Sequence, residues 1–322
     1  MDHDWQKLHD KIKNRPKTDA YLNRLQDLTF SLKENKELKV VYGAEYDENP
    51  ERMRMYELLT EERDDADIQQ LIFNRYLEYR SREVYQDFCN HVNYKTRFLA
   101  VKHPLLTGIS LVSETLGVSQ KLHIGTSFYR ARVNNGSITG LKDMGAPPVG
   151  VASEGRINAR GISVLYMADS PTTAISEIRP VKWDNVAIAK LHLKKELTIL
   201  NFSFEGVLAG LIAENNDFTT STLFHQAKIV AEKMSIPLTL SEKSTEYLPT
   251  QIIGDYVKLL GYDGICYDSS QHTNGKNYVF FDSNVLDFTH ERNELQSGWV
   301  KDVSYDYQST KMNTQEIIHD GE

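Results

Sequence analysis

The chain has 322 residues, of which 40% are hydrophobic and 25% are charged, a composition typical of a globular protein with room for two domains. The net charge of −8 excludes broad electrostatic binding to nucleic acid, but it leaves room for a local basic pocket around a small phosphorylated ligand. The two cysteines, Cys89 and Cys266, have neither zinc-ligand spacing nor the pattern of a disulfide framework, so we expect no metal site and a reducing, cytoplasmic environment.

The first third of the chain shows the apolar spacing of amphipathic helices. Apolar side chains recur at three- and four-residue intervals within 21–32 and again within 53–85, and a polar break at 42–51 separates the two segments. The N-terminus lacks the apolar core of a secretory signal, and no apolar run is long enough to span a membrane. We therefore predict a helical N-terminal domain over residues 1–110, without a membrane anchor.

Glycine usage rises after about residue 105. Glycines then recur every several residues as far as Gly155, with a Pro-Pro pair among them, which is typical of loops and strands rather than of a helical bundle. We place a domain boundary near 105–120 and predict a second domain over 111–293. The segment 294–322 is polar, so we expect a mobile C-terminal tail there.

Helices and strands are mixed in the second domain without the regular βαβ repeat of a doubly wound sheet, which predicts an α+β fold. The expected strands are 128–133, 163–168, 186–193, 197–202, 264–267 and 278–281, and the expected helices are 171–178, 219–234 and 247–260. The helix 171–178 has the clearest limits, because Ser170 is a good N-cap, Pro171 suits the first helical position and Pro180 ends the helix.

Several polar residues stand where a ligand could be held. In the strand FYRARV, alternation puts Phe128 and Arg130 on one face and Tyr129 on the other, and an inward-facing arginine needs an anionic partner. The GRIN segment at 155–158 lies among glycines that let the backbone approach a ligand, and Arg156 could hold a phosphate with its planar guanidinium.

Glu177 and a pair of serines are further candidates for a site because of their positions. Glu177 is the acid of the helix 171–178 and has small and apolar neighbours; taken alone, it would be a solvated helix residue paired with Arg179 or Lys182. Ser269 and Ser270 follow the strand 264–267, and strand ends are where α/β proteins place hydroxyls that contact ligands.

In this order the motifs resemble the RES domain, a family named for its Arg, Glu and Ser that occurs as the toxin of bacterial toxin–antitoxin pairs. The chain carries YR, GRxNxxG, LYxAxSPxTAxSE, PTQ, GYDGIxYxSS and a closing NxVxF, over about residues 125–285. The specific part is GRIN followed by LYMADSPTTAISE. The N-terminal half does not share the resemblance, but a helical region in front of the domain is similar in layout to proteins of the HEPN/RES type.

The resemblance implies a fold like that of the ADP-ribosyltransferases, with a split β-sheet, and an activity that consumes NAD as a substrate without a further cofactor. It matches the catalytic residues to Arg130, Glu177 and Ser269, with Ser270 as the alternative register. The residues expected to bind NAD are Tyr129, Arg156, Asn158, Tyr166, Ser270 and Asn277. Where many members have a basic residue just after the serine, this chain has Gln271 or His272.

The implied reaction breaks the bond between nicotinamide and ribose. Glu177 would stabilise the positive charge that develops on the ribose, Arg130 and Arg156 would hold the pyrophosphate, and Tyr166 would orient the nicotinamide ring. Ser269 would bind the ribose or the carboxamide. The acceptor stays open between water, phosphate and a target side chain, which correspond to an NAD hydrolase, a phosphorylase and a mono-ADP-ribosyltransferase.

Such a protein would act as a bacterial toxin or anti-phage effector, held in check by an antitoxin, by another regulatory protein or by its own N-terminal half. Two other hypotheses concern that half. Arg97 and His103 have the rough spacing of a HEPN ribonuclease pair, although Pro104 disfavours a helix there. Tyrosines such as Tyr79 and Tyr85 could instead form a contact face for a partner or for a homo-oligomer.

Overall fold

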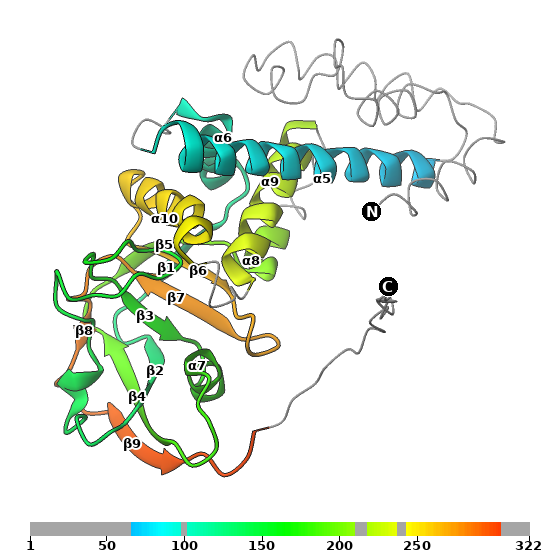
Figure 1. Cartoon of the computed structure of the whole chain (residues 1–322). Helices are drawn as coiled ribbons and strands as arrows, with labels where there is room; N and C mark the ends of the chain where they lie inside the picture. Colours follow the sequence, from blue (N-terminus) through cyan, green and yellow to red (C-terminus); the bar gives the residue numbers. More distant parts are fainter. Residues whose placement is uncertain (1–65, 98–101, 210–217, 237–242, 304–322) are drawn as a thin grey trace, which may run out of the picture.

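The computed structural model describes residues 66–97, 102–209, 218–236 and 243–303 (Figure 1). The helices expected before residue 66, and the end of the expected tail from residue 304, lie outside these described residues. Nine strands of the described part form one sheet in the order β1-β5-β6-β7-β3-β2-β4-β8, and β9 pairs with β4. All neighbouring pairs are antiparallel except β5 with β6, which is parallel. The predicted mixture of helices with a large mixed sheet is confirmed; a split sheet of the ADP-ribosyltransferase kind stays a prediction.

The strands are β1 Ser119–Leu122, β2 Ser127–Val133, β3 Leu165–Ala168, β4 Asn185–Leu193, β5 Leu197–Asn201, β6 Gly264–Asp268, β7 Lys276–Phe280, β8 Leu286–Asp287 and β9 Glu294–Trp299. The helices are α5 Ala66–Asn90, which runs into a π-helical turn at His91–Lys95, α6 Pro104–Thr115, α7 Pro171–Ile178, α8 Phe204–Ala209, α9 Phe218–Ser235 and α10 Lys243–Leu259. A 3-10 turn lies at Leu141–Met144. Every helix and strand predicted for the second half is present. The short strands β1, β8 and β9, the short helix α8 and the 3-10 turn were not expected.

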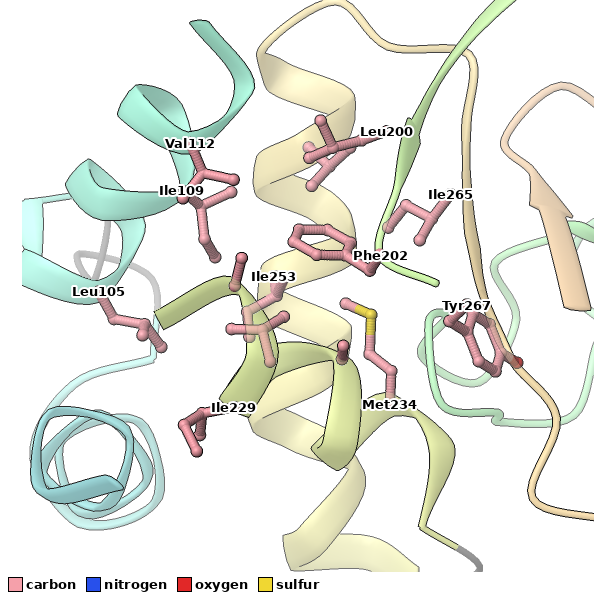
Figure 2. Close-up of a cluster of buried hydrophobic side chains, with 14 of the residues drawn as sticks. Leu105, Ile109, Val112, Leu200, Phe202, Ile229, Met234, Ile253, Ile265 and Tyr267 are labelled. Carbon is pink, nitrogen blue, oxygen red and sulfur yellow. The ribbon is translucent and has the colours of Figure 1, made fainter. Parts of the chain in front are cut away.

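The two faces of the sheet are covered differently. On one face, which we call the helical face, α6, α9 and α10 pack against β5 and β6, and Figure 2 shows Ile109, Met234 and Ile253 of these helices beside Phe202 and Ile265. The helix α7 covers the same face further along, with Ala174 against Ala131 and Ala168. The opposite face carries a second cluster around Phe128, Met144 and Phe280. Hydrophobic burial on both faces supplies most of the driving force for this arrangement.

The cluster on the helical face contains residues from both sides of the expected domain boundary. Phe88 of α5 and Leu105 of α6 belong to it together with Val230 of α9 and Ile265 of β6. The described end of the N-terminal region is therefore packed onto the second half of the chain. The division into domains at residue 110 stays a prediction.

Strand β9 occupies the first residues of the segment that the sequence predicts as a tail. All six of its residues are exposed, so they show no apolar alternation that would reveal a strand. What holds them is the backbone ladder to β4, with Asn185 opposite Trp299 and Lys190 opposite Glu294. The ladder continues through Trp183, whose N–H donates to the carbonyl of Val300.

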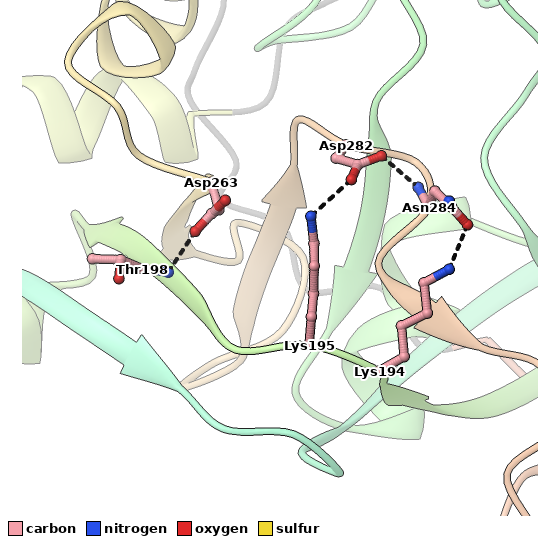
Figure 3. A network of polar contacts seen from close by, with 6 residues as sticks. All are labelled: Lys194, Lys195, Thr198, Asp263, Asp282 and Asn284. Atoms are coloured by element: carbon pink, nitrogen blue, oxygen red, sulfur yellow. Dashed lines mark hydrogen bonds and ion pairs between the residues drawn. The ribbon is translucent and has the colours of Figure 1, made fainter.

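The connections at one end of the sheet are tied by polar contacts on the surface (Figure 3). Lys195, between β4 and β5, pairs with Asp282 after β7 at 2.9 Å, and Lys194 Nζ donates to Asn284 Oδ1 at 2.6 Å. The hydrogen bond from Lys195 lowers the pKa of Asp282. Exposed pairs of this kind contribute little to the free energy of unfolding. Here they hold the connection between β4 and β5 against the segment that follows β7.

Among the described residues, the structure contains no helix with the length and apolar character needed to cross a membrane.

The buried imidazole of His225 on α9 predicts an acid-sensitive fold. Burial lowers the pKa of His225 from 6.5 to about 4, and its Nδ1 has no hydrogen-bond partner within the described residues. The imidazole of His225 takes up a proton at a higher pH in the unfolded chain than in the folded chain. Its contribution to the free energy of unfolding is therefore fully present above pH 6.5 and is lost as the pH falls toward 4. Between pH 7 and about pH 5 we expect a loss of roughly 2 kcal/mol in the free energy of unfolding.

Urea unfolding of the wild type and of His225→Leu at these two pH values measures the effect. The variant should lose roughly 2 kcal/mol less than the wild type between them. Equal losses would show that His225 does not stay neutral in the folded protein.

Candidate active site

A row of four residues crosses the helical face of the sheet and forms the floor of the candidate site. Tyr267 of β6 lies opposite Asn277 of β7, Asn277 opposite Ala168 of β3, and Ala168 opposite Tyr129 of β2. Directly paired residues of adjacent strands point to the same face, so these four side chains share one surface. The helix α7 packs over this row and carries Glu177 to it.

Glu177 is held against the floor by two hydrogen bonds to a single oxygen. Its Oε1 accepts from Asn277 Nδ2 at 2.8 Å and from Ser269 Oγ at 2.6 Å. Its Oε2 makes no hydrogen bond to the described residues, and the residue is exposed. The pairing of Glu177 with Arg179 or Lys182 that the sequence suggests does not occur in the described part of the chain, and Lys182 lies 3.9 Å from Asp302 instead. The carboxylate therefore has one oxygen fixed and one oxygen open.

The loop 269–275 between β6 and β7 brings Ser269 to this carboxylate. Ser269 Oγ accepts from the backbone N–H groups of Gln271 and His272, both at 3.1 Å, which leaves its own proton for Glu177. The backbone N–H of Ser269 donates to the carbonyl of Gly275 at 2.7 Å. Ser270 is exposed and its hydroxyl accepts from Gln271 Nε2 at 2.9 Å. Of the two possible registers, Ser269 is the serine that contacts Glu177.

Asn158 is used to fold the GRIN segment. Its Nδ2 donates to the carbonyls of Ser153, Ala159 and Ile162 at 2.9, 3.2 and 3.0 Å, and its Oδ1 accepts from Tyr166 Oη at 2.8 Å. A buried amide with this many partners has no free polar atom to offer a ligand. The structure thus gives Asn158 a positioning role, in which it shapes the loop that carries Arg156.

Tyr166 and α10 hold the same loop from the other side. Tyr166 Oη also accepts from the N–H of Ile157 at 3.2 Å, and burial raises the pKa of this phenol. Gln251 of α10 donates from Nε2 to the carbonyls of Gly155 and Asn158 at 2.9 and 3.1 Å. The PTQ motif at 249–251 therefore acts by anchoring the GRIN segment.

Arg156 extends from this anchored loop with its charge uncompensated. It is half-buried and forms no hydrogen bond or ion pair with the described residues. Burial raises the pKa of Tyr267, the charges of Tyr166 and Glu177 raise it further, and the positive charge of Arg156 opposes these effects. The unpaired guanidinium and the half-open carboxylate therefore both act electrostatically on the Tyr267 hydroxyl.

Arg130 is not brought to this group. It lies opposite Ala189 of β4, whose side chain belongs to the cluster on the opposite face, whereas its neighbour Tyr129 faces α7. Its Nη1 is out of reach of solvent and has no partner in the described part of the chain. Burial, followed by the charge of Arg132, lowers the pKa of Arg130 to about 9, so it stays protonated at neutral pH. Its assignment as a catalytic residue stays a prediction.

A model of the RES domain family matches residues 127–307, which is more than half of the chain. The chain belongs to the RES family. The match runs from β2 through β9 and includes Glu177, Arg156 and Ser269. It begins after α6, so the HEPN-type interpretation of the region before it stays a prediction.

The RES chain was also compared with solved structures and with curated proteins. A chain from the crystal structure of the M. tuberculosis MbcT–MbcA toxin–antitoxin complex matches with 12% sequence identity and a TM-score of 0.32, over 61% of this chain and 92% of that one. A comparison with curated proteins found no match.

Arg97 and His103, the pair on which the ribonuclease hypothesis rests, are N-terminal to the RES domain. His103 is the N-cap of α6: its Nδ1 accepts from the N–H of Leu105 at 3.2 Å, so its proton sits on Nε2, 3.2 Å from Asp87. Burial lowers the pKa of His103, and Arg97 is exposed. With Nδ1 capping α6 and Nε2 bonded to Asp87 of α5, the geometry favours a structural role for His103.

Sequence reasoning missed two residues of the RES site. Tyr267 lies in β6 two positions before Ser269, the first residue after the strand, and a two-residue spacing favours the same face for both side chains. Thr173 of α7 is fully buried and contacts Asp169 and His272, a set of contacts that links α7 to the loop 269–275. No sequence signal pairs Thr173 with His272, which are 99 positions apart.

Proposed function

We propose that this RES protein cleaves the bond between nicotinamide and ribose in NAD. The observation that carries the proposal is the Glu177 carboxylate, whose Oε1 is fixed by Asn277 and Ser269 while Oε2 stays open. Nicotinamide leaves NAD as a neutral molecule and needs no general acid, so the main barrier is the positive charge that develops on the ribose. A carboxylate whose orientation is fixed in advance stabilises that charge.

The remaining residues of the site take roles that follow from their placement. Arg156 binds the pyrophosphate, because a guanidinium without a protein partner can form bidentate bonds to phosphate oxygens. Tyr129 lines the floor beyond Ala168 and offers a ring that contacts the ribose or the nicotinamide, while the buried Tyr267 supports the floor beside Asn277. Asn158 and Tyr166 act indirectly by fixing the loop of Arg156. The proposed mechanism does not involve Arg130.

We further propose that the protein acts as a toxin or anti-phage effector, since unrestrained loss of NAD would harm the cell that makes it. An antitoxin or other regulatory protein, or residues of the N-terminal half, would supply the restraint. The helices α5 and α6 pack directly onto the RES domain, which gives such a restraint a physical connection to the site.

Nicotinamide release from NAD by the purified protein tests the proposed function. We expect the wild type to release nicotinamide and Glu177→Gln to be slower by at least about a hundredfold, because the amide keeps the shape but loses the charge. The matched control is Glu291→Gln, which removes the same charge from an exposed position away from the site and should keep the wild-type rate. A wild type that releases no more nicotinamide than Glu177→Gln would contradict the proposal.

A further inference from the structure

Thr173 determines where the proton of a neighbouring histidine sits. Its hydroxyl oxygen lies 2.7 Å from Asp169 Oδ1, 2.8 Å from Ser170 Oγ and 2.9 Å from His272 Nδ1. A hydroxyl has one proton to donate, and an ionised carboxylate only accepts, so this proton goes to Asp169. The oxygen of Thr173 must then accept from His272, which places the proton of the neutral imidazole on Nδ1.

The other nitrogen of His272 is consequently a free base. With the proton on Nδ1, the lone pair of the neutral ring is on Nε2. Nε2 makes no hydrogen bond to the described residues, and the residue is only half-buried. This is the arrangement of a histidine in which one nitrogen is held by the protein and the other can take a proton.

The ring is fixed next to the proposed reaction centre. Thr173 lies one helical turn before Glu177 on α7, so the bond to Thr173 holds the imidazole beside the helix that carries the carboxylate. The backbone N–H of His272 donates to Ser269 Oγ, which in turn donates to Glu177. A Cβ atom at Gly275 would come within 2.8 Å of His272 Nδ1 and 2.6 Å of Thr173 Oγ1, so the loop needs a glycine there for this contact.

The same loop offers little to a phosphate acceptor. The residues 269–275 include no lysine or arginine, and the next cation, Lys276, pairs with Glu205 at 2.5 Å. A phosphate ion carries close to two negative charges at neutral pH and would need a cation of its own beside the Glu177 carboxylate, because the proposed binding of NAD already uses Arg156. Water needs the opposite, a base that removes its proton as it attacks.

We propose that His272 Nε2 accepts the proton of an attacking water, which makes this RES protein an NAD hydrolase. The inference rests on the proposed cleavage of NAD. The bond between ribose C1′ and the nicotinamide nitrogen breaks, and its electron pair leaves with nicotinamide. A bond forms between the water oxygen and C1′, and one water proton moves to His272 Nε2 and then to solvent. The products are nicotinamide, ADP-ribose and a proton.

Two substitutions of His272 distinguish a role as general base from a purely structural role. In His272→Asn the side-chain amide can still donate to Thr173 from the place of Nδ1, but nothing replaces Nε2. In His272→Gln the amide reaches the place of Nε2 and the bond to Thr173 is lost. We expect His272→Asn to unfold at the wild-type temperature but to consume NAD at least about a hundredfold more slowly, with KM for NAD little changed. His272→Gln should be equally slow.

The pH profile and chemical rescue supply readouts that a structural role would not move. The pH–rate profile of the wild type should contain one ionisation that is absent from the profile of His272→Asn. The other charged groups on the adjoining elements, Asp169, Glu177, Asp268 and Lys276, are the same in both proteins. Azide is an anionic nucleophile with no proton to lose, so it should restore the rate of His272→Asn at least about tenfold. It should have little effect on the wild type.

Product analysis in phosphate buffer completes the test, and the expected product of the wild type is ADP-ribose. A phosphorylated ADP-ribose as the main product would overturn the inference, as would a His272→Asn variant with the wild-type rate and pH profile, or one that azide does not restore. These outcomes leave nicotinamide release by the wild type intact. Wild-type protein that leaves NAD unchanged would instead overturn the proposed function itself, and the inference with it.

Discussion

Replacing Asn277 with aspartate is expected to slow NAD cleavage by at least about a hundredfold at neutral pH. The substitution changes almost no volume, but it puts a second carboxylate where Asn277 Nδ2 now donates to Glu177 Oε1 at 2.8 Å. Two carboxylates at this distance cannot both stay ionised, so the pair retains a proton and one of its two apparent pKa values rises. A pair with one shared negative charge stabilises the ribose cation less well than the oriented Glu177 carboxylate does.

Steady-state nicotinamide release across pH measures this effect. The deficit of Asn277→Asp should shrink as the pH rises and the second carboxylate ionises. The matched control is Asn284→Asp, the same substitution at an exposed position, where the new carboxylate would lie against Lys194 and should leave the rate unchanged (Figure 3). If Asn277→Asp cleaves NAD as fast as the wild type at neutral pH, the charge of Glu177 is not what drives the reaction.

Changing Asn158 should damage both the fold of the loop and the binding of NAD. In Asn158→Leu the carbonyls of Ser153, Ala159 and Ile162 lose their donor in a buried place, and Tyr166 loses its acceptor. We expect a loss of about 2–4 kcal/mol in the free energy of unfolding, since each buried polar group left without a partner is costly. KM for NAD should rise, because Arg156 is no longer held at its position.

Asn158→Asp sharpens this test, since it keeps the shape of the side chain. It turns a donor toward three carbonyl oxygens into a carboxylate oxygen that repels them, so it should be at least as harmful as Asn158→Leu. Urea unfolding and the KM for NAD are the measurements, and Arg160→Ala, at an exposed position of the same loop, is the control expected to change neither. Variants of Asn158 with wild-type stability would show that the loop is not held by this amide.

Much of the fold could be predicted because its signals are local. The helix α7 begins and ends where the sequence places it, since Ser170 Oγ accepts from the N–H of Thr173 and Pro171 fills the first helical position. The buried strands β4 and β6 show themselves as apolar runs bounded by turns. The short strands β1 and β9 give no such signal, because most of their side chains are exposed and their hydrogen bonds go to distant partners.

In the site, too, the local features could be predicted and the contacts between distant segments could not. The alternation along β2 was predicted correctly, with Phe128 and Tyr129 on opposite faces, but the sequence does not say which face α7 will cover. For that reason Arg130 could be matched to the family motif and still lie away from Glu177. The polar atoms of Asn158 and Tyr166 could likewise have turned to a ligand or to the loop, and only the folded chain shows that they hold the loop.

Strand β9 has a practical consequence for shortened versions of the protein. Its six exposed residues contribute almost no hydrophobic burial, yet they satisfy the outward backbone groups of β4 between Asn185 and Lys190. A version that stops before Glu294 would leave these N–H and C=O groups bare beside the apolar residues Val186 and Ala187. An uncovered strand of this kind is a template on which further copies can add in register. By pairing with β4, the exposed residues of β9 therefore protect this edge of the sheet from aggregation.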